Sequence, residues 1–337
     1  MSVTIKDIAE AAGCAFSTVS RVLNNRPDVS KETRSRVLKA IDELNFVPNN
    51  VARTLKRTAS RNIAIIVKGN SNLLFQPMIE QLQDQIRDNH YTDFVHYIDE
   101  KANAVTFALQ VAKEFKPLGL IFLGGELNLF QEKFSIINIP SVLLTVSAKS
   151  LKFPNLSSVG VDDTTAAEQA IVYLLDRGHR KIGVIGGSVD KIEVNPRYEG
   201  MLKAFREHNI PFDPEVSYRP SRYSLDSAHR NTIRLIQNMP GITAIFAMSD
   251  VMAFGAMSAI SDQNLKVPDD ISVIGFDGVE LGSYYIPKLT TVCQPLDKIV
   301  KRGVEIVIDG IENEAPAVHE FVPFTMMRGK SVKRLTI

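Results

Sequence analysis

The sequence lacks the usual signals of secretion, membrane insertion and disulfide cross-linking. No apolar run reaches the ~18 residues that a membrane-spanning helix needs. The first residues, MSVTIKDIAE, carry charges where a signal peptide would have an apolar core. Only two cysteines are present, Cys14 and Cys293, too few for a disulfide framework and without metal-type spacing. We therefore expect a cytoplasmic protein with two reduced thiols and no membrane contact.

Signatures of common enzymes and cofactor sites are also missing. The segment VIGGSVD lacks the G-x-G-x-x-G spacing of a dinucleotide-binding loop, and no Walker loop occurs. The same segment is not the G-x-S-x-G turn of hydrolases. The 6 histidines form no H-x-x-x-H pair and have no nearby cysteines. We expect no enzyme, no cofactor and no metal site, although a catalytic group assembled from distant residues would not be visible here.

Acidic residues are scarce in one part of the chain. Residues 1–60 hold 10 Lys/Arg and 6 Asp/Glu, a net charge of +4, so the remaining 29 and 32 give −3. Between Glu43 and Glu80 there is no acid at all. A basic head on a mildly acidic body suggests that the head contacts a polyanion. The alternative is that these charges belong to a helix that only faces solvent.

Residues 5–23 have the pattern of two short helices joined by a tight turn. Apolar residues recur at helical spacing in both, and Gly13 supplies a stop between them. The second helix leaves four side chains facing outward: Phe16, Ser17, Ser20 and Arg21. Two helices with a glycine-containing turn form a helix-turn-helix. Outward Ser and Arg side chains can reach base edges and phosphates in a major groove.

A third helix and a thin fourth segment follow. Ser30 predicts the start of the third helix, whose inward face we assign to Val37, Leu38, Ile41 and Leu44. Pro48 then breaks the run and begins the segment 48–60. The apolar side of that segment is too small for a helix that is stable alone in water. We interpret it as a linker, or as a helix that orders on contact with a partner.

From residue 61 onward, apolar β-rich runs alternate with helical stretches. The runs are NIAIIV, LGLIFLG, KIGVIGG, ITAIFAMS and ISVIGFD. Continuous apolar strands between helices predict βαβ units and a buried parallel sheet. The length suits an α/β body of two doubly wound parallel-sheet lobes. Ligands of such folds bind at the carboxyl ends of the strands.

The ordered motifs closely resemble those of the lactose-repressor (LacI/GalR) family. The head and hinge carry TIKDIAEAAG, TVSRVLNN, VSKETRSRVLKAIDELNFVPN and VARTL. The body carries DRGHRKIGVIGG, PRYEGMLKAF, TAIFAMSDVMAFGAMSAI, VPDDISVIGFDG and IPKLTTVCQPLDKIV. The resemblance covers almost the whole chain. It implies an N-terminal all-α helix-turn-helix head with a hinge helix, and a body like that of periplasmic sugar-binding proteins.

By position, the resemblance implies which residues contact DNA. Phe16, Ser17 and Arg21 of the recognition helix would read bases. Further head contacts fall on Thr4, Thr18, Ser20, Asn24, Ser30 and Thr33. Hinge contacts fall on Asn49, Ala52, Arg53, Leu55 and Lys56, with Leu55 as an apolar wedge in the minor groove. Ala15 stands where the family usually has Ser, and the missing capping hydroxyl weakens the helix by ~1 kcal/mol.

The resemblance also implies six effector-contacting residues: Phe75, Thr145, Arg197, Tyr223, Ser249 and Asp277. Arg197 would hold effector hydroxyls or carboxylates, Asp277 would accept sugar hydroxyls, and Tyr223 would be an aromatic platform. Thr145 stands where many members carry Asp, and Ala166 replaces a common Gly. The first change removes a hydrogen-bond acceptor, so the effectors of the best-known members do not transfer directly.

The implied organisation is a head (1–47), a hinge (48–60) and a body (61–337). Lobe 1 would take about 61–158 and 289–318, and lobe 2 about 159–288 and 319–337. We expect a homodimer, since no terminal heptad repeat for a tetramer is present. It would bind a pseudo-palindromic double-stranded DNA operator and a small, carbohydrate-like effector. One alternative is a catabolite-type regulator controlled mainly by a partner protein. Another is a solute-binding protein, which residues 1–60 count against.

Overall fold

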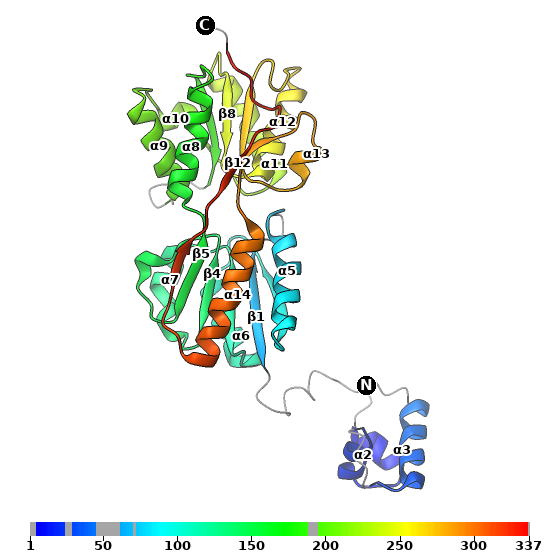
Figure 1. The fold of residues 1–337 in the computed structure, drawn as a ribbon. Coiled ribbons are helices and arrows are strands. Elements are labelled where there is room, and N and C mark those ends of the chain that lie inside the picture. The colour runs from blue at the N-terminus through cyan, green and yellow to red at the C-terminus, as the bar shows by residue number, and fades with distance from the viewer. Residues whose placement is uncertain (1–4, 24–28, 45–60, 70–71, 188–194, 336–337) are drawn as a thin grey trace. The chain divides into compact units, whose positions relative to one another are not determined.

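The computed structural model describes residues 5–23, 29–44, 61–69, 72–187 and 195–335. The chain divides into two compact units, Met1–Ser60 and Arg61–Ile337. The described part of the first unit, the head, is helical, and the second, the body, contains two six-stranded sheets with helices on both faces (Figure 1).

The described residues of the head form three helices: α1 (Ile5–Ala11), α2 (Phe16–Leu23) and α3 (Lys31–Glu43). Gly13 has a φ of +60°, the left-handed conformation that lets the chain leave α1 and start α2 within a few residues. Ile8, Val19 and Val37, one from each helix, are fully buried against one another in a small apolar core. The helix-turn-helix predicted from the sequence is therefore present.

The start of α3 agrees with the sequence prediction, but part of its inward face does not. The backbone N–H of Thr33 donates to Ser30 Oγ at 3.2 Å, so Ser30 caps the helix. The prediction is wrong for Leu38, which is 53% exposed, while Ala40 is buried. The reason is helical geometry, because Ala40 lies three residues after Val37 on the same stripe and Leu38 lies about 100° away.

Lobe 1 of the body is built on a fully parallel sheet of order β11-β5-β4-β3-β1-β2. Its strands are β1 (Asn62–Lys68), β2 (Thr92–Ile98), β3 (Gly119–Leu123), β4 (Ser141–Leu144), β5 (Leu156–Gly160) and β11 (His319–Phe321). Residues 63, 65 and 67 of β1 pack with the core under α5 (Phe75–Asp88) and α14 (Leu296–Asn313). Residues 64 and 66 pack under α6 (Ala104–Phe115) and α7 (Leu127–Lys133) on the other face. The described residues of lobe 1 also include two short 3-10 turns, η1 (Phe134–Ile136) and η2 (Lys149–Leu151).

Lobe 2 has a sheet of order β12-β10-β9-β8-β6-β7, parallel except for β12. Its strands are β6 (Ile182–Gly186), β7 (Tyr218–Pro220), β8 (Ala244–Ala247), β9 (Ser272–Asp277), β10 (Thr290–Cys293) and β12 (Thr325–Met327). Its helices are α8 (Asp163–Leu175), α9 (Pro196–Glu207), α10 (Pro214–Ser217), α11 (Leu225–Asn238), α12 (Asp250–Asp262) and α13 (Leu281–Tyr284).

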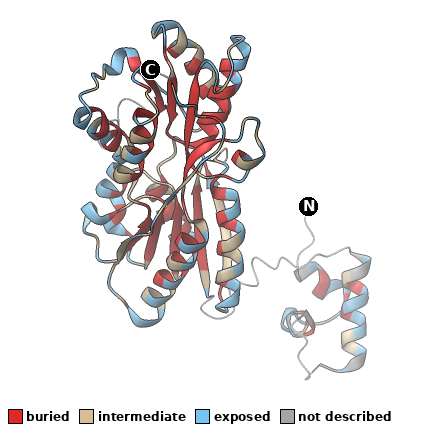
Figure 2. Cartoon of the chain, turned by 45° about the horizontal axis from the view of Figure 1, so that its top comes forward, coloured by how far each residue is buried: buried red, intermediate tan, exposed pale blue. Residues whose placement is uncertain are grey.

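The central strands of both sheets are buried on both faces, as their continuous apolar sequences predict (Figure 2). Helices pack on each face, and the longest of them, α14, is amphipathic, with one apolar side against lobe 1. Within the described part of the chain, no helix combines the length and the apolar character needed to cross a bilayer.

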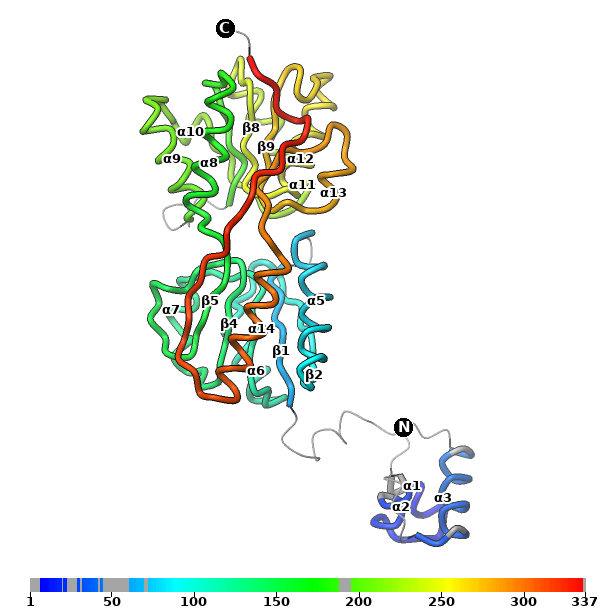
Figure 3. The backbone as a smooth tube through the Cα atoms, in the orientation of Figure 1, coloured from blue at the N-terminus to red at the C-terminus, as the bar shows by residue number. Residues whose placement is uncertain are grey.

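The chain passes between the lobes three times (Figures 1 and 3). The first crossover joins β5 to α8, the second joins β10 to α14, and the third joins β11 to β12. Strand pairing shifts the lobe boundaries expected from the sequence. Residues 290–293 pair with β9 and belong to lobe 2, whereas residues 159–160 and 319–321 lie in the lobe 1 sheet. The correction reflects hydrogen-bond pairing, which no periodicity reveals.

Candidate functional site

The outward face of α2 carries the head residues expected to contact DNA. Phe16 is 55% exposed, Ser17 and Arg21 are exposed, and Thr18 is half-buried. Because Val19 and Val22 are buried, α2 is held by its inner side while its outer side remains accessible. Ser30 and Thr33 lie at the start of α3, where their hydroxyls are 2.9 Å apart.

Several of the expected DNA contacts lie outside the described residues. These are Thr4, Asn24, Asn49, Ala52, Arg53, Leu55 and Lys56, together with the side chain of Ser20. Their assignment stays a prediction.

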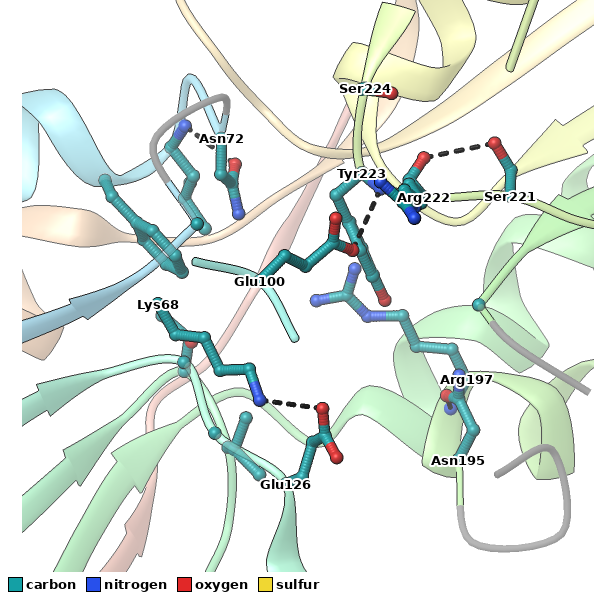
Figure 4. A pocket seen from close by; sticks show the side chains of 18 of the residues that line it. Lys68, Asn72, Glu100, Glu126, Asn195, Arg197, Ser221, Arg222, Tyr223 and Ser224 are labelled. Carbon is teal, nitrogen blue, oxygen red and sulfur yellow. Dashed lines mark hydrogen bonds and ion pairs between the residues drawn. The ribbon is translucent and has the colours of Figure 1, made fainter. Parts of the chain in front are cut away.

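In the body, a cleft of about 960 Å³ lies between the lobes, near the upper limit for small-molecule sites. It is lined by residues at or just after the carboxyl ends of strands from both sheets, including Lys68 at the end of β1, Gly124 after β3 and Asp277 at the end of β9. This is the edge at which parallel α/β sheets bind ligands. Figure 4 shows the polar side chains that reach into it from opposite sides.

Arg197 is the central cation of the lobe 2 side. Its Nε donates to Asp163 Oδ1 at 2.8 Å, and its Nη1 donates to the Met248 carbonyl at 2.5 Å and lies 3.5 Å from Asp277 Oδ1. The guanidinium also lies 3.7 Å from the centroid of the Phe276 ring. Although burial alone would lower the pKa of Arg197, the two carboxylates raise it. Arg197 is therefore permanently charged and already neutralised.

Local helix starts put Arg197 and Asp163 side by side. Asn195 caps α9 by accepting from the backbone N–H of Arg197 at 3.0 Å, and Pro196 occupies the first turn. Asp163 begins α8, which Asp162 caps. The two helices approach closely because Gly200 has no side chain, and a Cβ there would lie 1.9 Å from the Thr164 carbonyl oxygen.

Asp277 is the buried acceptor of the site. Gln294 Nε2 donates to its Oδ1 at 2.9 Å, and its backbone φ is +125°, a region that non-glycine residues rarely adopt. Burial raises the pKa of Asp277 to about 6, against the opposing effect of Arg197. Its carboxylate is therefore ionised near neutral pH and can accept hydrogen bonds from hydroxyl groups.

The lobe 1 side presents an aromatic ring and a second ion pair. Phe75 begins α5 and lines the cleft, and Thr145 follows β4 with a φ of +69°. Lys68 and Glu126 pair at 2.7 Å, with Lys68 almost buried. Across the cleft, the backbone N–H of Tyr223 lies 3.5 Å from Glu100 Oε1, which links the two lobes (Figure 4).

The structure brings five of the six expected effector residues to the cleft: Phe75, Thr145, Arg197, Tyr223 and Asp277. Ser249, the sixth expected residue, does not line the cleft. It is buried outside the cleft lining, and its hydroxyl accepts from the backbone N–H of Met252 as the cap of α12. Its neighbour Asp250 is fully buried and accepts from Thr291 Oγ1 and from the backbone N–H of Val279, so this pair supports the loop after β9.

Sequence reasoning missed the partners of these residues. Asp163, Lys68 and Glu126 line the cleft, and each lies at a strand end or within three residues after one. The strand-end rule could have nominated them. Gln294 carried no such signal, because its contact with Asp277 depends on how β9 and β10 pair. Among the described residues, no group of three or more His, Cys, Asp or Glu side chains could hold a metal ion.

Comparison with known proteins gives consistent matches over the chain. Residues 4–49 match the family described as bacterial regulatory proteins, lacI family, and residues 171–332 match the periplasmic binding protein-like domain. The chain is 39% identical over 326 residues to the HTH-type transcriptional regulator MalR of Clostridium butyricum, covering 94% of this chain and 95% of that protein. It is 33% identical over 341 residues to the probable HTH-type transcriptional repressor ExuR of Bacillus subtilis, covering 99% of both.

Solved structures agree. The lac repressor dimer bound to operator and the anti-inducer ONPF has a TM-score of 0.71 at 25% identity, covering 99% of this chain and 100% of that one. The complex of the transcriptional regulator CelR with cellobiose has a TM-score of 0.69 at 23% identity, covering 98% and 99%, which shows the shared fold.

Proposed function

This chain belongs to the LacI family of bacterial regulatory proteins, and from that premise we propose that it is a repressor controlled by a neutral carbohydrate bound between its lobes. It is a DNA-binding transcriptional regulator that acts on operator DNA as a homodimer. Its relatives are transcription regulators.

The charge balance of the cleft carries this proposal. Among the described lining residues, Asp99, Glu100, Glu126, Asp163 and Asp277 are acidic, and Lys68, Lys101, Arg197 and Arg222 are basic. The two buried cations, Lys68 and Arg197, are already paired with carboxylates. An anionic ligand such as a sugar phosphate or a uronate would meet no surplus positive charge, so desolvating its charge would be uncompensated. A neutral ligand avoids this cost.

Hydroxyl groups suit the remaining hydrogen-bonding capacity. Arg197 has further N–H donors beyond those given to Asp163 and Met248, and Asp277 has acceptor capacity beyond its bond to Gln294. Phe75 and Tyr223 add aromatic surface from the two lobes. Donors, acceptors and aromatic faces together match a polyhydroxylated ring, which pairs polar edges with apolar faces.

On the DNA side, we assign base contacts to Phe16, Ser17 and Arg21. We assign the coupling between the body and the head to residues 48–60, which lie outside the described residues. Two such segments at the dimer axis would pair and place Leu55 in the minor groove, where an apolar wedge unstacks a base step. Ligand binding in the body would change the spacing of the two chains at residue 61 and so favour or oppose this pairing.

A two-step experiment tests the proposal. Full-length protein first selects its duplex from a random library. Thermal shift and calorimetry then compare ribose, maltose and cellobiose with glucose 6-phosphate, glucuronate and hypoxanthine. A ligand at 100 times its Kd adds about 2.7 kcal/mol to stability, a shift that thermal unfolding resolves. We expect a neutral saccharide to bind and to change affinity for the selected duplex.

Two outcomes would contradict the proposal. Binding of only the anionic sugars would refute the charge argument. An Asp277→Ala variant that kept full affinity for the bound saccharide would refute the site, because loss of this acceptor leaves ligand hydroxyls unpaired and costs on the order of 2 kcal/mol.

A further inference from the structure

One buried side chain beside the cleft, Gln294, has a polar atom without a hydrogen-bond partner among the described residues. Gln294 is 5% exposed and is not part of the cleft lining. Its amide nitrogen donates to Asp277 Oδ1 at 2.9 Å, and its backbone N–H donates to the Asp277 carbonyl at 3.0 Å. Within the described residues, its amide oxygen Oε1 has no hydrogen-bond partner. Buried polar atoms without a partner are rare in native folds and point to strain, an absent ligand or water, or a second conformation.

Gln294 occupies one of the three crossovers between the lobes. Cys293, the last residue of β10 in lobe 2, pairs with Asp277 across the sheet, and α14 of lobe 1 begins at Leu296. Only Gln294 and Pro295 separate these elements. At this crossover, a rotation of one lobe against the other must therefore be absorbed within a few bonds of the side chain that holds Asp277.

Asp277 itself is held in a strained conformation. Most other described non-glycine residues with positive φ, such as Lys116, Lys152 and Glu314, end helices, where a left-handed residue is common. Asp277, at +125°, instead ends a strand at the cleft. Strained residues persist where the surrounding structure holds them, and they cluster at ligand sites and switches. The two hydrogen bonds from Gln294 are part of what holds Asp277.

We propose that Gln294 is a positioning residue that couples ligand binding at Asp277 to the movement of the two lobes about the second crossover. A ligand hydroxyl that donates to Asp277 Oδ1 shares that oxygen with the Gln294 amide and weakens the hydrogen bond from Gln294. The amide can then change its hydrogen bonds, which its unpartnered oxygen permits, and the crossover moves with it. This inference rests on the proposed function, since it takes Asp277 as a ligand contact.

The test measures the affinity for sugar separately from the response, which is the change in duplex affinity that the bound sugar causes. Wild type, Gln294→Met, Gln294→Glu and Asp277→Ala are titrated with ribose, maltose and cellobiose by calorimetry. The change in affinity for the selected duplex is then measured with each sugar at saturation. For Gln294→Met we expect affinity for the bound sugar to fall by less than about tenfold, as for one lost hydrogen bond, while the response of duplex binding is largely lost. Asp277→Ala should lose more affinity than Gln294→Met, and its response should also be lost at saturation, because the carboxylate that connects the ligand to Gln294 is gone.

A second readout needs neither sugar nor DNA. The hydrogen bond from Gln294 lowers the pKa of Asp277, so Gln294→Met and Gln294→Glu should shift the Asp277 titration to higher pH. The other described ionisable groups around Asp277 are Arg197 on α9, Asp163 on α8, Asp250 on α12, Tyr223 before α11 and Cys293 on β10, and all remain in these variants. The shift is read from the pH dependence of thermal unfolding, with Asp277→Asn as the background that lacks the titrating group.

Asn155→Ala is the matched control. Asn155 also uses its amide to bond backbone carbonyls, those of Ile137 and Ile139, but it lies far from Asp277 in the chain and is not part of the cleft lining. It should change stability without changing the response or the Asp277 titration. If affinity and response fall together in Gln294→Met, or neither changes, Gln294 is merely structural and the proposal is wrong. If no sugar binds, the proposed function fails, and an unshifted titration would separately overturn the role of Gln294.

Discussion

Replacing Arg197 with Met removes the one cation shared by two buried carboxylates. In the wild type, Arg197 Nε lies 2.8 Å from Asp163 and Nη1 lies 3.5 Å from Asp277, and all three side chains are nearly buried. Breaking a buried ion pair by deleting one partner costs about 3–5 kcal/mol, because the remaining charge is buried without compensation. For a unit of this size, that corresponds to a drop of roughly 6–10 °C in Tm.

The cost should depend on pH in a definite direction. Burial raises the pKa of both carboxyl groups, and Arg197 opposes that rise. Without Arg197, both folded-state pKa values rise further. A raised folded-state pKa destabilises the protein above that pKa, and the effect disappears as pH falls toward the unfolded value. The drop in Tm should therefore be larger at pH 7.5 than at pH 5, where the carboxyl groups take up protons.

Circular dichroism melts of full-length protein at pH 5, 6 and 7.5 measure this effect. Arg302→Met is the matched control, because Arg302 also pairs with two carboxylates, Glu320 and Glu305, but at a half-exposed site. Ion pairs in contact with solvent contribute about 0–1 kcal/mol, so the control should melt closer to wild type than Arg197→Met. An equal drop for Arg197→Met at all three pH values would refute the argument, as would a drop no larger than that of the control.

Three further predictions follow from the same geometry. Burial raises the pKa of Asp277 to about 6, whereas its unfolded value is about 3.9. The free energy of unfolding should therefore fall as pH rises from about 3.9 towards 6. Asp277→Asn should reduce this dependence of stability on pH in scanning calorimetry. Arg21→Ala should weaken binding to the selected duplex by ~1–3 kcal/mol in fluorescence anisotropy, while Lys39→Ala, on the exposed side of α3, should have a smaller effect. Leu55→Ala should reduce both affinity and DNA bending, followed by energy transfer in a doubly labelled duplex; unchanged bending would identify residues 48–60 as a passive linker.

Much of the fold was predictable because its signals are local. Continuous apolar runs such as NIAIIV became strands buried on both faces, and the glycine-containing turn at Gly13 became the link between α1 and α2. Leu38 was mispredicted because a stripe on a short helix has only a few positions, and one residue of drift moves a side chain from core to solvent. The lobe boundaries were shifted because strand pairing is a long-range property.

The candidate site also combines features that could be predicted from the sequence with contacts that could not. The strand-end position of Asp277 and the helix-start position of Arg197 could be read along the chain. Asp163, the ionic partner of Arg197, comes from another helix, and the contact depends on Gly200 allowing α8 and α9 to approach. Ser249 looked like a ligand contact, but a hydroxyl at a helix start has a competing use as a cap. Only the three-dimensional arrangement decides between these uses.

The three crossovers have a consequence for the order in which the body can fold during synthesis. Lobe 1 needs α14 and β11, which come from residues 296–321, after almost all of lobe 2 has been made. When residues 61–160 leave the ribosome, one face of their sheet still lacks the long helix that will cover Val142 and Leu144. Lobe 2 has nearly all of its strands earlier and lacks only β12. Since domains generally fold as units during synthesis, lobe 2 should complete its core first, and lobe 1 should remain the part of the body most dependent on chaperones until residues 296–321 have been made.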